Sequence, residues 1–338
     1  MVASSSEAPD GLLIVDKPAG VTSHDVVARV RKLAATRKVG HAGTLDPMAT
    51  GVLVLGLGRA TRLLGHLALT DKTYVATARL GVTTVTDDAD GDVVTTTSAA
   101  QLDADAVRAA AERFVGTIDQ VPSSVSAVKQ GGRHAYDRVR AGEEVVLAAR
   151  TVTISELVIG EVRVVDDHLD VDLTVVCSSG TYVRAIARDL GAALGVGGHL
   201  TMLRRTRVGP FTLEDPTHVL AEPALSAPVP ARQDRTEEMV AAQRAALPLV
   251  TLPDAVSAAF PRIDLDAAEA LRVADAGRAV VPPSAGDLEG EGPFGVFGPE
   301  GLLALMERRG DALRSLIVFA PSNLRPRPPA PEPARIDP

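Results

Sequence analysis

The chain has 338 residues, of which 46% are hydrophobic, 23% charged and 3% aromatic. This length suits about two domains, and the composition excludes a disordered chain and a minimal disulfide scaffold. Cys177 is the only cysteine, and the seven histidines show no HExxH-type spacing. We therefore expect neither a disulfide nor a metal site within the chain.

The charge is distributed unevenly. A net charge of −8 argues at first against a polyanionic partner. Between Lys17 and Arg62, however, there are eight Lys or Arg and two acids, and between Tyr182 and Arg207 there are five Arg and one acid. Such clusters also occur on ordinary solvated faces, so charge alone leaves a nucleic-acid partner open.

Membrane insertion and secretion are not expected. The apolar runs, such as residues 52–57 and 316–320, are far shorter than the roughly 18 residues of a spanning helix. Glu7 and Asp10 lie where a secretory signal would be basic. We predict a cytoplasmic protein without a membrane partner.

The first elements follow from hydrophobic spacing. Residues 12–15 and 52–57 predict short buried strands, and strict alternation predicts half-buried strands at 73–80 and 169–176. A helix that Thr22 or Ser23 could cap is predicted from four apolar residues on one face: Val26, Val27, Val30 and Leu33.

Later elements complete an α+β protein. Helical spacing predicts helices at 105–114 and 183–194, a Pro- and Ala-rich connection begins at 222, and residues 232–244 are expected to be partly helical. A small β-rich unit follows. We divide the chain into an N-terminal extension (1–10), a main domain (11–250), a small domain (251–320) and a disordered proline-rich tail (321–338).

One short loop, residues 38–51, combines several polar side chains. His41, Thr44 and Asp46 lie within it, and Pro47 restricts Asp46 to an extended backbone. An Asp before Pro is also a common turn residue, so the loop alone does not establish a catalytic carboxylate. The nearby Gly56-Leu-Gly58 lacks the third glycine of a dinucleotide loop, and we reject nucleotide-cofactor binding.

Arg184 lies where an arginine is unfavourable without a partner. Arg184 falls in the predicted first turn of a helix, where the helix dipole disfavours a cation by roughly 0.3–1 kcal/mol. An acidic partner such as Asp46 would offset this, although an exposed Arg in water remains the alternative.

Tyr74 and Tyr182 are two of only three tyrosines. Flat rings suit an extruded base, but Tyr74 could equally be a core strand residue.

Seven segments, in this order, resemble the TruB family of tRNA pseudouridine synthases. The match covers about residues 11–215. The resemblance implies a mixed, largely antiparallel pseudouridine synthase fold with a small C-terminal β-rich, PUA-like RNA-binding domain. The segments are KPAGVTS (17–23), GHAGTLDPMATGVL (40–53), DKTYVATARLG (71–81), TDDADG (86–91), SAVK (126–129), SSGTYVRAIARDLG (178–191) and HLTMLRRTRVGPF (199–211).

The implied activity is conversion of uridine-55, in the T loop of tRNA, to pseudouridine. This isomerisation changes no net oxidation state and imports no atom, so no cofactor is expected. The resemblance makes Asp46 the catalytic aspartate and Arg184 its partner, and gives Tyr74 the stacking position and a candidate role in proton transfer. It places His41, Tyr182 and Leu203 at the uridine pocket. Whether the carboxylate attacks C1′, adds to C6 or assists a glycal route stays open.

RNA contacts are expected from an insertion and from basic side chains. Residues 122–150 resemble the family's mobile RNA-binding insertion, whose phosphate contacts could include Ser126, Lys129, Arg133, Arg138 and Arg140. Outside it, we predict RNA contacts for Lys17, Arg29, Lys32, Arg204 and Arg205.

The partner implied is the T arm of tRNA. We expect a monomer that needs no obligatory protein partner. An RNA-guided rRNA pseudouridylase of the same superfamily is one alternative, although the C-terminal unit is short and has no basic extension. An RNA-folding chaperone with secondary catalysis is another.

Overall fold

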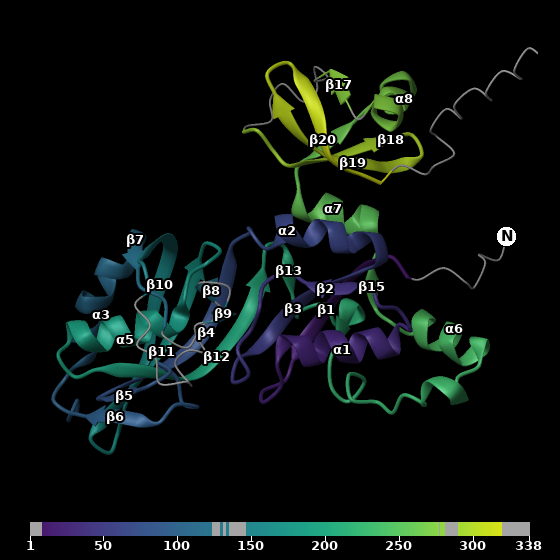
Figure 1. Cartoon of the computed structure of the whole chain (residues 1–338). Coiled ribbons are helices and arrows are strands. Elements are labelled where there is room, and N and C mark those ends of the chain that lie inside the picture. The colour runs from purple at the N-terminus through teal and green to yellow at the C-terminus, as the bar shows by residue number, and fades with distance from the viewer. Residues whose placement is uncertain are drawn as a thin grey trace, which may run out of the picture. The chain divides into compact units, whose positions relative to one another are not determined.

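The computed structural model describes residues 9–123, 129–130, 133–134, 147–276, 278–280 and 290–319. The chain divides into two compact units (Figure 1): residues 13–249 belong to the first, and residues 10–12 together with those from 250 onward belong to the second. The proline-rich tail and most of the N-terminal extension lie outside the described residues. Within those ranges, no helix is long and apolar enough to cross a membrane.

The first unit is built on one mixed sheet. The pairings that lead from β12 through β4, β11 and β10 to β7 are antiparallel, whereas β3 with β12 and β1 with β14 are parallel. In sheet order the strands are β14 (Val219–Leu220), β1 (Gly11–Lys17), β3 (Thr50–Leu57), β12 (Gly198–Val208), β4 (Lys72–Leu80), β11 (His168–Cys177), β10 (Arg150–Val165) and β7 (Gly116–Gln120). The predicted mixed, largely antiparallel sheet is confirmed.

Three short strands extend this sheet. They are β2 (Val39–His41), which pairs with β3, β13 (Phe211–Thr212), which pairs with β12, and β15 (Leu249–Val250), which pairs with β1. Separate hairpins are formed by β5 (Val82–Thr84) with β6 (Val93–Thr96) and by β8 (Lys129–Gln130) with β9 (Arg133–His134). The loop between β5 and β6 contributes to the site described below.

Amphipathic helices cover the apolar side of the sheet (Figure 1). In α1 (Ser23–Leu33), Thr22 is the N-cap and forms a capping box with Asp25, and all four predicted apolar residues are buried. The predicted helices at 105–114 and 183–194 are present as α3 (Ala104–Ala111), which continues into a 3₁₀ turn, and α5 (Val183–Ala193). The described part of this unit also contains α2 (Leu64–Leu67), α6 (Glu237–Ala245) and 3₁₀ turns at Gly58–Leu63, Glu112–Phe114, Pro216–His218 and Arg232–Asp234.

The second unit, in its described residues, combines a small sheet with two helices. Its strands, in sheet order, are β16 (Arg262–Asp264), β18 (Phe294–Gly298), β19 (Gly301–Arg309), β20 (Ala312–Val318) and β17 (Arg278–Val280). The expected β-rich unit is therefore present. Hydrophobic spacing did not single out its helices, α7 (Leu252–Ala259) and α8 (Ala267–Ala276).

Candidate active site

The Asp46 loop joins β2 to β3 and is held by buried side chains. Ser23 Oγ donates to the Leu45 carbonyl at 3.0 Å and accepts from the Leu45 amide at 2.9 Å. The fully buried Lys17 ammonium donates to the Pro47 carbonyl at 3.2 Å and to two carbonyls of its own turn. Because both residues flanking Asp46 are bonded in this way, its carboxylate is presented by a fixed backbone.

Arg205 holds the same loop from the neighbouring strand. Its guanidinium, 1% exposed, donates to the Val52 carbonyl at 2.8 Å and to the Gly43 carbonyl at 3.1 Å. Gly51 permits this approach, because it adopts φ +99° and a Cβ there would lie 2.1 Å from the Arg205 carbonyl oxygen. The loop and β12 are therefore locked together.

Arg184 reaches Asp46 from the first turn of α5, and the predicted ion pair is confirmed. Arg184 Nη2 lies 3.0 Å from Asp46 Oδ2. Its Nη1 lies 3.1 Å from Asp88 Oδ2 and donates to the Thr86 carbonyl at 2.7 Å. The side chains of Arg184 and Asp88 are 5% and 6% exposed, whereas Asp46 is 38% exposed. One buried guanidinium thus connects a buried carboxylate to an accessible one.

Gln120 fixes the start of α5, where no side chain caps the helix. Its amide, at the end of β7, accepts from the Tyr182 amide at 2.8 Å and donates to the Tyr182 carbonyl at 3.1 Å. The sequence analysis did not identify Gln120 or Asp88 as site residues. Asp88 did lie in the TDDADG segment, but nothing in the sequence alone connected it to Arg184.

These groups border a cavity of about 240 Å³ in the first unit. Asp46, Tyr74, Tyr182, Arg184 and Leu203, all predicted site residues, line it. The cavity is smaller than the roughly 300–1,000 Å³ of sites for drug-sized ligands, which suits a small flat group such as a nucleobase. The rest of its lining comprises Gly43, Thr44, Leu45, Ala68, Lys72, Gly180, Thr181, Val183 and Arg205.

Burial shifts the titration of two lining groups. Desolvation raises the pKa of the Tyr74 phenol, and the adjacent Arg205 guanidinium offsets only part of this rise. Desolvation lowers the pKa of Lys72 from 10.5 to about 8. The Lys72 ammonium donates to the carbonyls of Ala68 at 3.0 Å and Thr70 at 2.6 Å. At neutral pH the cavity therefore contains a protonated phenol.

His41 lies beside the loop rather than in the cavity lining. Its ring makes an edge-to-face contact with His24, with 5.6 Å between ring centroids, and its buried Nδ1 has no hydrogen-bond partner in the described chain. Burial, reinforced by His24 and Arg205, lowers the pKa of His41.

The described ranges contain no cluster of three or more His, Cys, Asp or Glu able to hold a metal ion.

Several predicted RNA contacts do not fit the structure. Lys17 and Arg205 are buried and bonded to backbone carbonyls, and Arg204 forms a two-pronged ion pair with Asp16 at 3.0 and 2.9 Å. For Lys17 and Arg205 the prediction is wrong, because the charged group is used inside the chain. The Arg204 side chain is 38% exposed, so its RNA contact stays a prediction. Arg29 donates to carbonyls of the 225–227 segment, which leaves its phosphate contact unsupported.

The remaining predicted RNA contacts are compatible or lie elsewhere. Lys32 is exposed on α1. The backbones of Lys129 and Arg133 belong to the β8–β9 hairpin, but their side chains are outside the described part, as are Ser126, Arg138 and Arg140.

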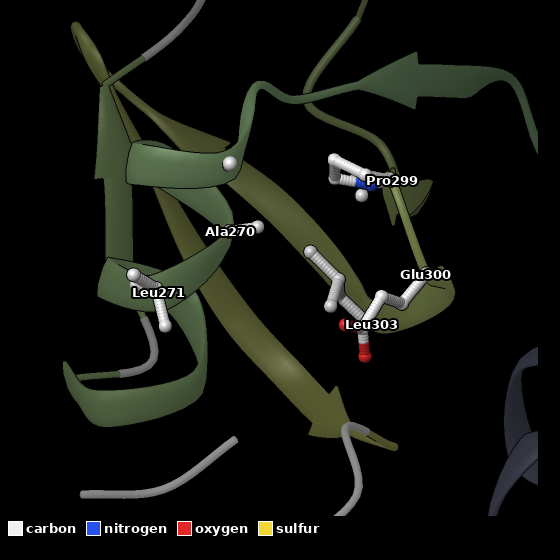
Figure 2. A pocket seen from close by; sticks show the side chains of 7 residues that line it. Ala270, Leu271, Pro299, Glu300 and Leu303 are labelled. Atoms are coloured by element: carbon white, nitrogen blue, oxygen red, sulfur yellow. The ribbon is translucent and has the colours of Figure 1, made fainter.

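A second cavity, of about 230 Å³, lies within the second unit (Figure 2). It is lined by α8, through Ala270 and Leu271, and by the β18–β19 segment, through Pro299, Glu300 and Leu303. Its only ionisable lining side chain is Glu300, so it offers no constellation for catalysis.

Three family models match successive parts of this chain. The family described as TruB family pseudouridylate synthase (N terminal domain) matches residues 31–183, the tRNA pseudouridylate synthase B C-terminal domain matches 184–245, and tRNA Pseudouridine synthase II, C terminal, matches 260–320. A relative named tRNA pseudouridine synthase B, from Thermobifida fusca (strain YX), is 53% identical over 93% of this chain and 99% of its own. The chain belongs to the TruB family. A second relative of that name, from Arthrobacter sp. (strain FB24), is 51% identical over 94% of this chain and 98% of its own.

Solved structures place the TruB-family chain in the same fold group. A chain in the crystal structure of a Cbf5-Nop10-Gar1 complex matches with a TM-score of 0.66 and 26% identity, over 94% of this chain and 87% of that chain. A chain in the structure of an H/ACA RNP bound to a substrate RNA containing 2′-deoxyuridine matches with a TM-score of 0.64. The expected pseudouridine synthase fold is confirmed.

Proposed function

We propose that this protein isomerises uridine to pseudouridine in tRNA, with Asp46 as the catalytic carboxylate. The observation that carries the proposal is the accessible Asp46 carboxylate at the small cavity, held at 3.0 Å by the buried Arg184. Relatives of about 50% identity over more than nine-tenths of the chain are named tRNA pseudouridine synthase B. We assign the modification to uridine-55 of the T loop.

The site suits a reaction that keeps all its atoms. The bond from N1 to C1′ breaks, the uracil turns, a bond from C5 to C1′ forms, C5 loses its proton and N1 gains one, so the composition is unchanged. Asp46 supplies the carboxylate, whether it acts at C1′, at C6 or through a glycal. Arg184 orients it, and the small cavity retains the detached base between Tyr74 and Leu203. Because its pKa is raised, the Tyr74 phenol is suited to stacking and hydrogen-bond donation rather than to proton abstraction.

RNA affinity is assigned to basic residues outside the cavity lining. The exposed Lys32 and the insertion around Lys129 and Arg133 are the candidates for phosphate contacts, and His41 is the candidate for a contact beside the flipped nucleotide. We further propose that the protein acts in the cytoplasm as a monomer, without a guide RNA or an obligatory protein partner.

The test is incubation of the pure protein with unmodified tRNA in the absence of other RNA, followed by mapping of pseudouridine at nucleotide resolution. The proposal expects stoichiometric pseudouridine at uridine-55 and none elsewhere. Modification only when a guide RNA is added would favour the RNA-guided alternative. Improved tRNA folding without pseudouridine would favour the chaperone. Either result would contradict the proposed function.

A further inference from the structure

Helix α5 presents two arginines, one turn apart, to two successive aspartates in the β5–β6 loop. The guanidinium of Arg184 contacts Asp88 and also contacts Asp46. Arg188, four residues later, contacts Asp87, with 3.1 Å between Nη1 and Oδ2. Residues four apart lie on the same helix face, so both pairs bind the same loop. The second pair does not touch the cavity.

The backbone at Asp87 adopts an uncommon conformation. Asp87 has φ +57°, a left-handed conformation that a residue other than glycine adopts at an energetic cost, although Asp and Asn tolerate it best. The Leu200 amide of β12 donates to the Asp87 carbonyl at 3.0 Å. The carboxylate of Asp87 is 13% exposed, and Arg188 is its ion-pair partner. The loop is thus fixed from both the backbone and the side chain.

Arg188 is itself anchored to a third element. Its Nη2 donates to the carbonyl of Val121, directly after β7, at 2.8 Å, and its Nε contacts Asp189 at 2.8 Å. It therefore joins α5, the end of β7 and the β5–β6 loop at one point. The loop residues on either side of Asp87 are Thr86 and Asp88. Arg184 donates a hydrogen bond to the Thr86 carbonyl and forms an ion pair with the Asp88 carboxylate.

We propose that Asp87 and Arg188 are a positioning pair for the reaction. By fixing the left-handed turn, they hold Thr86 and Asp88 where Arg184 needs them, and Arg184 in turn orients Asp46. This inference rests on the proposed function and adds to it a layer of residues that contacts neither the cavity nor the RNA.

The structure offers a matched control. Arg79 and Asp170 form an ion pair of almost the same exposure, 31% and 14% against 27% and 13%, on the β4–β11 part of the sheet. Asp87→Asn and Asp170→Asn each remove one charge, and asparagine tolerates the left-handed turn, so backbone strain is not introduced. Thermal unfolding, tRNA affinity and the single-turnover rate constant are measured for both variants.

For Asp87→Asn we expect a rate constant reduced about tenfold with tRNA affinity within about twofold of wild type. Asp170→Asn is expected to lower the melting temperature by about as much as Asp87→Asn does, but to leave the rate constant within about twofold of wild type. A rate loss in Asp87→Asn no greater than that in Asp170→Asn would overturn the inference. So would a parallel loss of tRNA affinity, which would indicate an RNA contact.

A double substitution tests the route through Asp88. If Asp87 acts on Asp46 through this loop, adding Asp87→Asn to Asp88→Asn lowers the rate constant by less than about twofold further. A full additional tenfold loss would mean an independent role and would overturn the inference. Failure of the proposed function looks different, because wild-type protein would then form no pseudouridine in tRNA at all.

Discussion

Replacing Arg184 by methionine should separate its structural role from its catalytic one. Arg184→Met removes the partner of two carboxylates that differ in exposure. Asp88 is 6% exposed and would be left as an uncompensated buried charge, whereas Asp46, at 38%, remains solvated. The stability loss should therefore come almost entirely from Asp88 and from the freed Thr86 carbonyl.

The expected size follows from that burial. Breaking a buried ion pair from one side costs about 3–5 kcal/mol, while a solvent-screened pair contributes about 0–1 kcal/mol. We expect Arg184→Met to lower the free energy of unfolding by about 3–5 kcal/mol. Because the Asp46 carboxylate also loses its anchor, the single-turnover rate constant should fall by more than about a hundredfold.

A second substitution distinguishes the two effects. Adding Asp88→Leu to Arg184→Met removes the stranded buried charge, so it should restore about half of the lost stability or more. It cannot restore the contact to Asp46, so activity should stay low. Urea denaturation followed by circular dichroism measures the first effect, and single-turnover pseudouridine formation measures the second. An Arg184→Met variant that loses less than about 1 kcal/mol, or whose activity recovers with Asp88→Leu, would refute the reasoning.

Three further predictions follow from the contacts around the site. The pKa of Lys17 is lowered by burial from 10.5 to about 8, so between these values the unfolded chain binds more protons. The free energy of unfolding of wild type minus that of Lys17→Met should therefore rise by about 2 kcal/mol between about pH 7.5 and 9.5 in urea titrations. A difference that does not change with pH would contradict the burial of Lys17. Gln120→Ala should cost about 1–3 kcal/mol and slow turnover, because it removes the acceptor of the Tyr182 amide and one of the donors to the Tyr182 carbonyl. Gln101→Ala, which removes an exposed side-chain hydrogen bond, is the control, and equal effects would contradict the role of Gln120. In salt titrations of tRNA binding, Lys32→Gln should reduce the log–log slope by about 0.7–0.9, whereas Arg29→Gln should not, since Arg29 is bonded to residues 225 and 227; the reverse result would contradict the placement of both.

Local sequence patterns predicted the elements whose burial is regular. In β4 and β11, side chains alternate between buried and less buried positions, and α1 combines a regular apolar face with a capping box. Strand β10 was missed because two register shifts, at Ile154/Glu156 and Ile159/Val162, break its alternation. β12 was missed for the same reason, with shifts at Leu200/Met202 and Arg205/Arg207.

The site was predicted where a family motif or a simple physical conflict marked a residue. Arg184 is the clearest case, since a cation in the first turn of a helix requires an acidic neighbour, and that neighbour is present. Its second partner, Asp88, lies in the TDDADG segment almost one hundred residues distant, but nothing in the sequence connected it to Arg184. Long-range partners of this kind depend on the packing of the whole sheet.

For the basic side chains, the sequence did not predict which are buried. Lys17 and Arg205 were predicted as RNA contacts because lysine and arginine are seldom buried, and a sequence does not reveal the carbonyls that surround them. In the structure, backbone oxygens of the Asp46 loop and its neighbours satisfy Lys17 and Arg205. These two cations hold the Asp46 loop from within the chain.

The most direct test of the central claim compares Asp46→Asn with Asp16→Asn. Asp16 is a partly exposed carboxylate of the same unit that pairs with Arg204 and lies away from the cavity. Single-turnover pseudouridine formation and equilibrium binding are measured on the same unmodified tRNA. The account predicts that Asp46→Asn forms no detectable pseudouridine while its tRNA affinity stays within a few-fold of wild type, and that Asp16→Asn remains active. More than about a hundredth of the wild-type rate in Asp46→Asn would contradict the assignment of Asp46 as the catalytic carboxylate.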